Sequence, residues 1–229
     1  MLSGPGKNAL GTELMKRFRA DLYAAGGAPV LVRGEGDAFS AGLDLLEVAS
    51  LDAGGMTAFL LELEGLLRDV WTYPGPTAAA VNGHAIAGGC LVAMACDLRV
   101  ATDNPKARIG LNEVALGLRF PPAILRMIRA RLPASSLEEV LLGAALYGPA
   151  DALRLGLVDA VAADAVAAAR ERLSVRAAYP ADGYATAKRD LRGGVLDIGD
   201  AERATFAAEV VPVWTSDALK ARIRGFLRK

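Results

Sequence analysis

The side chain best suited by sequence to do chemistry is Glu113, which lies among the apolar residues Leu111, Val114 and Leu116. Burial among such neighbours raises the pKa of a carboxyl group, because a low-dielectric surrounding disfavours the charged form. A carboxylate tuned in this way suits proton transfer at neutral pH. The alternative is an ordinary glutamate at a helix start or in a turn, and Glu113 alone does not decide between the two.

Two glycine-bearing segments could present backbone N–H groups to such a site. Residues 39–45 (FSAGLDL) and 82–91 (NGHAIAGGCL) each carry a turn that follows a predicted strand. Donors left unpaired at Gly88 would also lie at the start of a helix, where the macrodipole favours developing negative charge. Together the turns could form an oxyanion hole, although for either motif alone a simple tight turn is the better interpretation.

Taken with residues 109–113 (IGLNE), these segments resemble, in order and spacing, the three signature blocks of the crotonase (enoyl-CoA hydratase/isomerase) superfamily. The strings FSAGLDL, AGGCLVA and GLNE are most similar to those of mitochondrial-type Δ3,Δ2-enoyl-CoA isomerases. The resemblance implies an acyl-CoA thioester as substrate, with coenzyme A part of that substrate and no separate cofactor. It also implies a homotrimer or a dimer of trimers.

The same resemblance implies roles for individual residues. The oxyanion hole would consist of the backbone N–H groups of Leu43 and Gly88, and Glu113 would be the catalytic acid/base. The candidates for contact with the acyl-CoA are Ala38, Phe39, Ala41, Leu43, Asp44, Gly88 and Lys220. Asp44 and Asp97 are also expected to bond local backbone N–H groups, as aspartates beside turns and helix ends commonly do.

Leu91 bears on which reaction is catalysed. Hydratases of the superfamily usually carry a second glutamate at the position of Leu91, and the two carboxylates together activate water. Moving a double bond from C3 to C2 needs one base, which removes the C2 proton and returns it to C4. The sequence therefore favours an isomerase. Two alternatives stay open: a hydratase or another crotonase reaction with a second acid such as Glu47, and a non-catalytic acyl-CoA-binding relative.

Composition argues against several other classes of protein. Lysine plus arginine and aspartate plus glutamate both total 26, so the chain has no net charge that would attract nucleic acid or a membrane surface. Cys90 and Cys96 lie in an apolar stretch, which suggests a reducing compartment and a packed Cys90 thiol. His84, the single histidine, has no evident catalytic partner, and it could join the cysteines around a metal only through unusual geometry. We therefore expect no metal site.

Helical and strand patterns alternate over the first two thirds of the chain. Helices are predicted at 10–25 and 56–71, and strands at 29–33, 78–82, 97–101, 107–110 and 157–161. Beyond residue 164 the patterns are helical, at 165–177, 184–191, 201–211 and 216–227. Such alternation predicts an α/β core. The resemblance adds a crotonase-like spiral of repeated ββα units over residues 1–162, and a helical region over 163–229 for oligomerisation and part of the acyl-CoA site.

The apolar segment 77–96 is about long enough to span a bilayer. It contains Asn82 and the Gly88-Gly89 pair, so it instead predicts a buried strand, a turn and a helix. No targeting signal is evident at either end of the sequence, and the cytoplasm is the expected location.

Overall fold

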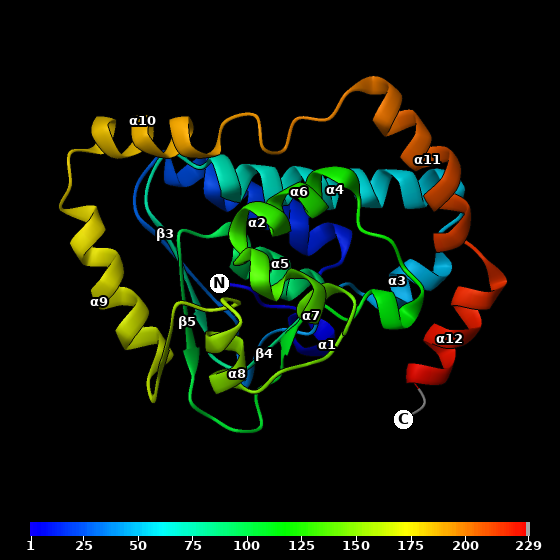
Figure 1. The fold of residues 1–229 in the computed structure, drawn as a ribbon, viewed down its shortest axis with the longest axis horizontal. Helices are drawn as coiled ribbons and strands as arrows, with labels where there is room; N and C mark the ends of the chain where they lie inside the picture. Colours follow the sequence, from blue (N-terminus) through cyan, green and yellow to red (C-terminus); the bar gives the residue numbers. More distant parts are fainter. Residues whose placement is uncertain (228–229) are drawn as a thin grey trace.

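The computed structural model describes residues 1–227 and contains two parallel β-sheets flanked by helices (Figure 1). The four-stranded sheet has the order β1-β3-β5-β7, formed by Val30–Arg33, Thr77–Val81, Leu98–Thr102 and Ala160–Ala162. The three-stranded sheet has the order β2-β4-β6, formed by Ala38–Ser40, His84–Ile86 and Ile109–Gly110. Every pairing within both sheets is parallel.

Successive strand pairs give the fold its repeat. The pairs β1–β2, β3–β4 and β5–β6 each place one strand in the larger sheet and the next in the smaller one. Helices follow each pair, so the chain advances by repeated ββα units, as the family resemblance implied. Parallel neighbours require such crossovers, because a tight hairpin can join only antiparallel strands.

Helices cover these sheets on several sides. Those of the first 162 residues are α1 (Pro5–Asn8), α2 (Thr12–Ala25), α3 (Leu45–Ser50), α4 (Ala53–Thr72), α5 (Gly88–Ala95), α6 (Pro122–Arg131), α7 (Leu137–Leu141) and α8 (Pro149–Arg154). Two short 3-10 turns lie at Val114–Leu116 and Ala134–Ser136. Every residue of α5 is buried, since α4, α6 and the strands β2, β3 and β4 surround it. The core is therefore centred on α5.

The helices predicted beyond residue 164 are present as α9 (Ala165–Ala177), α10 (Ala181–Arg192), α11 (Asp200–Trp214) and α12 (Asp217–Leu227). Helix α9 packs on the four-stranded sheet, whereas α10 and α11 lie along α4 and α12 meets α3 (Figure 1). The C-terminal helices thus wrap the core from one end to the other. The division into regions 1–162 and 163–229 stays a prediction.

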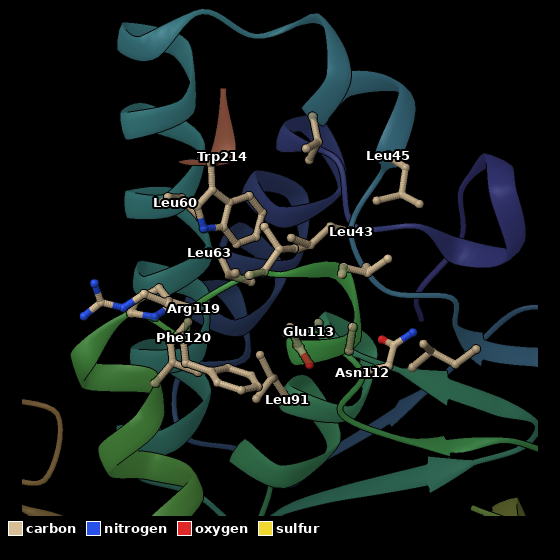
Figure 2. A pocket seen from close by; sticks show the side chains of 18 of the residues that line it. Leu43, Leu45, Leu60, Leu63, Leu91, Asn112, Glu113, Arg119, Phe120 and Trp214 are labelled. Carbon is tan, nitrogen blue, oxygen red and sulfur yellow. The ribbon is translucent and has the colours of Figure 1, made fainter. Parts of the chain in front are cut away.

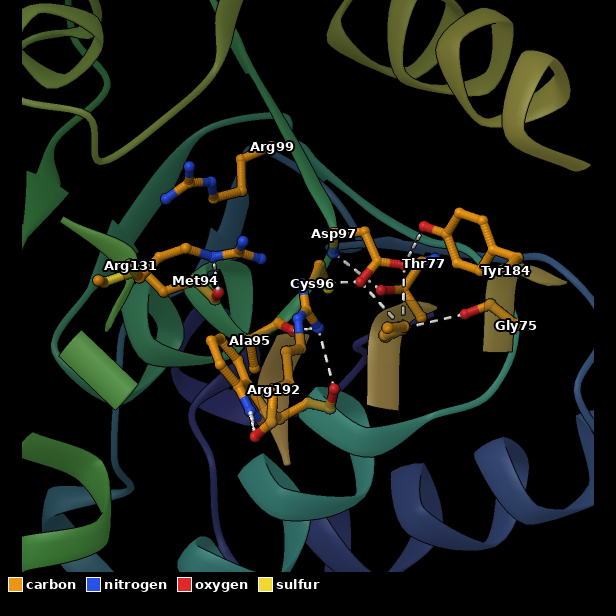
Figure 3. A network of polar contacts seen from close by, with 12 residues as sticks. Gly75, Thr77, Met94, Ala95, Cys96, Asp97, Arg99, Arg131, Tyr184 and Arg192 are labelled. Carbon is orange, nitrogen blue, oxygen red and sulfur yellow. Dashed lines mark hydrogen bonds and ion pairs between the residues drawn. The ribbon is translucent and has the colours of Figure 1, made fainter. Parts of the chain in front are cut away.

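A buried network of charges anchors α10 to the core (Figure 3). The carboxylate of Asp97, just after α5, accepts hydrogen bonds from Tyr184 Oη at 2.8 Å and Lys188 Nζ at 2.9 Å. Arg192 Nη2 lies 2.8 Å from Asp97 Oδ1, and its guanidinium stacks 4.3 Å from the ring centre of Trp71. Asp97 also accepts from the backbone N–H of Thr77, which agrees with the structural role expected for it.

The structure departs from the predicted elements in several places, and the predicted strand 107–110 is shortened to β6. The last strand starts at Ala160 instead of 157, because the N–H groups of Leu157 and Val158 bond back to Ala152 O at the end of α8. Residues 84–86, predicted as part of a turn, form β4 between two strand neighbours. Among residues 1–227 no helix combines the length and apolar character that crossing a membrane requires.

Candidate active site

A cavity of about 220 Å3 lies beside α5, and its wall is mainly apolar (Figure 2). Segments far apart in the sequence form this wall. They are the turn after β2 (Ala41, Leu43, Leu45), α4 (Leu60, Leu63), α5 (Gly88, Leu91), the segment after β6 (Asn112, Glu113, Leu116, Leu118, Arg119, Phe120) and the last helices (Trp214, Leu219, Ile223). A mainly apolar pocket with a few polar groups is typical of a small-molecule site.

Glu113 is the one carboxylate that lines this cavity in the described part of the chain. The residue is 7% exposed, and its Oε2 has no hydrogen-bond partner among residues 1–227. Burial disfavours the charged form and raises the pKa of Glu113 to about 8. Its backbone is fixed, since its carbonyl accepts from the N–H groups of Leu116 and Leu118. This is a carboxyl group held ready for proton transfer.

The turn after β2 leaves a backbone donor free at Leu43. Leu10 N–H donates to Gly42 O at 2.7 Å, and Asp44 N–H donates to Leu10 O at 3.1 Å. In an extended chain, successive N–H groups point to opposite sides, so the N–H of Leu43 faces away from Leu10. Within residues 1–227 that N–H donates to no backbone or side-chain acceptor.

A second free donor lies at the start of α5. The first hydrogen bond of the helix runs from Leu91 N–H to Ala87 O at 2.9 Å, so the N–H of Gly88 has no partner within the helix. Ala87 precedes it with φ 47° and ψ −117°, a conformation that a non-glycine residue adopts only under strain. Strained conformations of this kind are common at functional sites. Here the strained residue forms the sharp turn between β4 and α5.

The two turns pack against each other, so that Leu43 and Gly88 are neighbours. Gly42 has φ 97°, and a Cβ there would lie 2.8 Å from Ile86 O. A Cβ on Gly88 would lie 2.9 Å from Leu43 Cδ2. Leu43 and Gly88 both line the cavity, and it stays a prediction that their N–H groups hold one oxygen atom between them. The helix dipole of α5 would further stabilise negative charge on that oxygen.

Leu91 occupies the part of the wall close to Glu113 (Figure 2). It is fully buried and offers no group that could position water. Glu47, the alternative second acid, does not line the cavity. Its carboxylate instead accepts hydrogen bonds from the N–H and hydroxyl of Thr12, where it caps the start of α2. The structure therefore brings no second carboxylate of residues 1–227 to Glu113.

The remaining predicted site residues divide into two groups. Ala41 lines the cavity with Leu43 and Gly88, whereas Ala38 and Phe39 are fully buried in β2 and do not. Asp44 caps α3 by accepting from Leu46 N–H and Glu47 N–H, and Lys220 donates from α12 to Leu51 O at 3.3 Å. Their contact with coenzyme A stays a prediction.

Cys90 and His84, for which the sequence predicts no catalytic role, are also affected by burial. Burial raises the pKa of the Cys90 thiol to about 12, so this thiol packs as a small hydrophobe. His84 Nδ1 is buried without a hydrogen-bond partner in the described chain. No group of three His, Cys, Asp or Glu side chains within residues 1–227 is arranged as metal ligands would be.

Sequence reasoning missed three polar residues of the wall: Asn112, Arg119 and Trp214. Asn112 Oδ1 and Trp214 Nε1 are both buried without hydrogen-bond partners among residues 1–227. Asn112 could have been found from its place beside Glu113 in the GLNE string. Arg119 and Trp214 carry no local signal, because only the packing of α11 against the segment after β6 brings them to the cavity.

Comparison with known proteins places these features in context. The enoyl-CoA hydratase/isomerase family model matches residues 2–211. Mitochondrial enoyl-CoA delta isomerase 1 of Mus musculus is 39% identical over 123 residues, which are 54% of this chain and 43% of that protein. A putative enoyl-CoA hydratase of Thermus thermophilus is 41% identical over 137 residues, 58% of this chain and 53% of that protein. The matches thus span about half of each relative.

A solved structure matches a larger share of the chain than these sequence relatives do. The crystal structure of human mitochondrial Δ3,Δ2-enoyl-CoA isomerase superposes with a TM-score of 0.91 at 25% sequence identity. The superposition covers 98% of this chain and 90% of that one. Both the parallel sheets and the C-terminal helices therefore have equivalents in that structure, which agrees with the predicted fold class.

Proposed function

The chain belongs to the enoyl-CoA hydratase/isomerase family and has the crotonase fold, and from this premise we propose that it is a Δ3,Δ2-enoyl-CoA isomerase. The observation that carries the proposal is the lone carboxylate of Glu113 in the cavity wall, with Leu91 beside it. The similarity to enoyl-CoA delta isomerase 1 of mouse supports the same reaction. A relative named as a putative hydratase makes hydration the competing reaction.

The proposed chemistry needs no group beyond the chain and its substrate. The thioester oxygen lies between the N–H groups of Leu43 and Gly88, and ionised Glu113 takes a proton from C2. The electron pair of that C–H bond forms the C1–C2 double bond of a dienolate, while the C=O π electrons move onto the thioester oxygen and the C3–C4 double bond remains. The protonated Glu113 then delivers the same proton to C4. The C3–C4 π electrons form the new C4–H bond, the C1–C2 π electrons become the C2–C3 double bond, and the C=O bond is restored. Removing one donor from such a hole costs roughly a hundredfold to a thousandfold in rate.

Hydration would need more than this cavity offers. Adding water across C2–C3 requires the water to be oriented and deprotonated while a proton reaches C2. Two carboxylates accomplish this in the hydratases that the sequence resembles, but Leu91 offers no polar atom, and Glu47 is held by Thr12. The burial of Glu113 without a partner also argues against a non-catalytic relative, since an unpartnered buried carboxyl group is costly to keep for packing alone.

The experiment that tests the proposal compares two reactions of the purified protein. We expect trans-3-hexenoyl-CoA to be converted to trans-2-hexenoyl-CoA at least about a hundredfold faster than trans-2-hexenoyl-CoA is hydrated, since hydration lacks its second acid/base. Faster hydration than isomerisation would overturn the isomerase and favour a hydratase. Binding of hexanoyl-CoA without either reaction would favour the non-catalytic relative.

We further propose, from the family resemblance, that the chain assembles as a homotrimer or a dimer of trimers through its C-terminal helices. Light scattering on the purified protein measures the number of subunits directly. A monomer in solution would contradict the assembly but not the isomerase reaction.

A further inference from the structure

Two hydrogen-bond donors in the cavity wall take no part in the proposed proton transfer. They are the guanidinium of Arg119, which follows the turn after Glu113, and the indole N–H of Trp214 at the end of α11. Figure 2 shows Arg119 on the side of the cavity away from Leu43 and Leu45, with Trp214 between Arg119 and Leu43. Since Leu43 marks the thioester end, these donors lie where the far end of an acyl chain would reach.

The indole N–H of Trp214 has no hydrogen-bond acceptor in the described part of the chain. The residue is 3% exposed. Buried tryptophan N–H groups usually find a partner, because leaving such a donor unpaired destabilises the protein. A phenylalanine would fill the wall without this penalty. The indole N–H is therefore a candidate donor to a bound molecule.

Arg119 contributes the one positive charge in the cavity wall within residues 1–227. Its side chain is 62% exposed, and Nη1 lies 2.8 Å from Glu209 Oε2, which is also exposed. Exposed ion pairs of this kind contribute little free energy, so a ligand can replace Glu209 at small cost. The guanidinium borders both the cavity and the open groove between α6 and α11, where Arg126 and Arg129 also lie.

We propose that this end of the cavity binds a carboxylate at the far end of the acyl chain, so that the substrate is the CoA thioester of an unsaturated dicarboxylic acid. The inference rests on the proposed isomerase function and names its substrate class. Arg119 supplies charge-assisted hydrogen bonds to one or both carboxylate oxygens, and Trp214 Nε1–H donates another. Leu60, Leu63 and Phe120 cover the intervening methylene groups. A plain alkyl chain would leave the indole N–H unpaired and place a methyl group against a cation.

Binding of saturated ligands tests this inference without turnover. Isothermal titration calorimetry compares adipoyl-CoA with hexanoyl-CoA, and suberoyl-CoA with octanoyl-CoA, so that each pair differs in the distal carboxylate. We expect the dicarboxylic ligand of at least one pair to bind about tenfold more tightly to the wild type, as a charge-assisted hydrogen bond would give. Arg119→Met should abolish the preference, and Trp214→Phe should reduce it about threefold or more, the effect of one neutral hydrogen bond.

Two controls separate this role from packing and from general charge. Arg129→Met removes an equal charge from the same groove but not from the cavity wall, and it should keep the preference. Hexanoyl-CoA should bind Trp214→Phe and the wild type within about twofold, because the ring still fills the wall. Equal or tighter binding of the alkyl ligand in both pairs, or a preference kept in Arg119→Met, would overturn the inference and leave the isomerase proposal standing. If none of the four ligands binds, both proposals fall.

Discussion

Two buried carboxyl groups lie near opposite ends of α5, and the protein treats them in opposite ways. The Asp97 side chain follows the C-terminal end and is 7% exposed, whereas Glu113, which lines the cavity at the N-terminal end, is 7% exposed as a whole residue. Burial raises the pKa of Asp97, but Lys188 and Arg192 outweigh it and hold that pKa below its usual value. Within residues 1–227 Glu113 forms no ion pair, and burial raises its pKa to about 8.

The difference shows that burial alone does not fix what a carboxyl group does. Asp97 is ionised and joins Lys188, Arg192 and Tyr184 of α10 to the core (Figure 3). Glu113 keeps an oxygen without a partner in the described chain and can exchange a proton. Pairing therefore assigns a structural role to one group and leaves the other available for chemistry.

The largest expected effect comes from removing the free carboxylate. Glu113→Gln should lower kcat/KM for 3-hexenoyl-CoA by about 10⁴-fold, because no other base lines the cavity in residues 1–227. Its melting temperature should stay the same or rise, since an unpartnered buried carboxyl group is lost. Steady-state kinetics and calorimetry measure the two quantities. A variant that unfolds more easily and keeps its activity would reverse the roles assigned to Glu113 and Asp97.

Asp97→Asn should show the opposite pattern. Leaving Lys188 and Arg192 buried without their shared counter-charge should lower the free energy of unfolding by about 3–5 kcal/mol. Below the melting temperature, kcat for isomerisation should change little, because Asp97 does not line the cavity. Urea denaturation followed by circular dichroism measures the loss. As a matched control, Asp37→Asn removes an exposed partner of Lys7 and should change stability by less than about 1 kcal/mol.

The pH dependence of kcat/KM should also distinguish Glu113 from Asp97, with a smaller effect than Glu113→Gln. The free enzyme needs ionised Glu113 as its base, and the pKa of that group is about 8. The value of kcat/KM should therefore rise by nearly tenfold per pH unit below pH 7 and level off above about pH 8. Initial rates between pH 5 and 9 measure the profile. A profile that is flat from pH 5 would mean that Glu113 is already ionised there.

In the pH dependence of stability the two groups should act with opposite sign. The pKa of Glu113 is raised on folding, so the native state holds its proton more tightly and stability falls as pH rises from about 4.5 to 8. The pKa of Asp97 is lowered, so its contribution is present above its usual value of 3.8 and is lost as pH falls below it. Glu113→Gln should flatten the first decline and Asp97→Asn the second, in urea titrations at several pH values.

Local patterns in the sequence determined the long elements and the chemical candidates. Helix α9 has the predicted bounds of 165–177, and α4 extends the predicted helix by one to three residues at its ends, because an apolar stripe at helical spacing is visible in a single segment. The sequence also marked Leu43, Gly88 and Glu113, since the motifs that carry them are short and contiguous. Their roles were inferred only because the three motifs occur together and resemble a known family.

Tertiary structure decided everything that depends on contacts between distant segments. Strands as short as β4 and β6 are defined by hydrogen bonds to their neighbours, and α7 and α8 are too short for an apolar stripe to mark them. Helix α6 does carry such a stripe at Ala123, Ile124, Met127 and Ile128, which was missed. The sequence placed Asp97 in a structural role but did not identify Lys188 and Arg192 as its partners, 91 and 95 residues further along the chain. It also gave no sign that Arg119 and Trp214 would share a cavity with Glu113. Residue types are a local property, whereas the pKa of a carboxyl group and the shape of a pocket depend on which distant side chains fold against them.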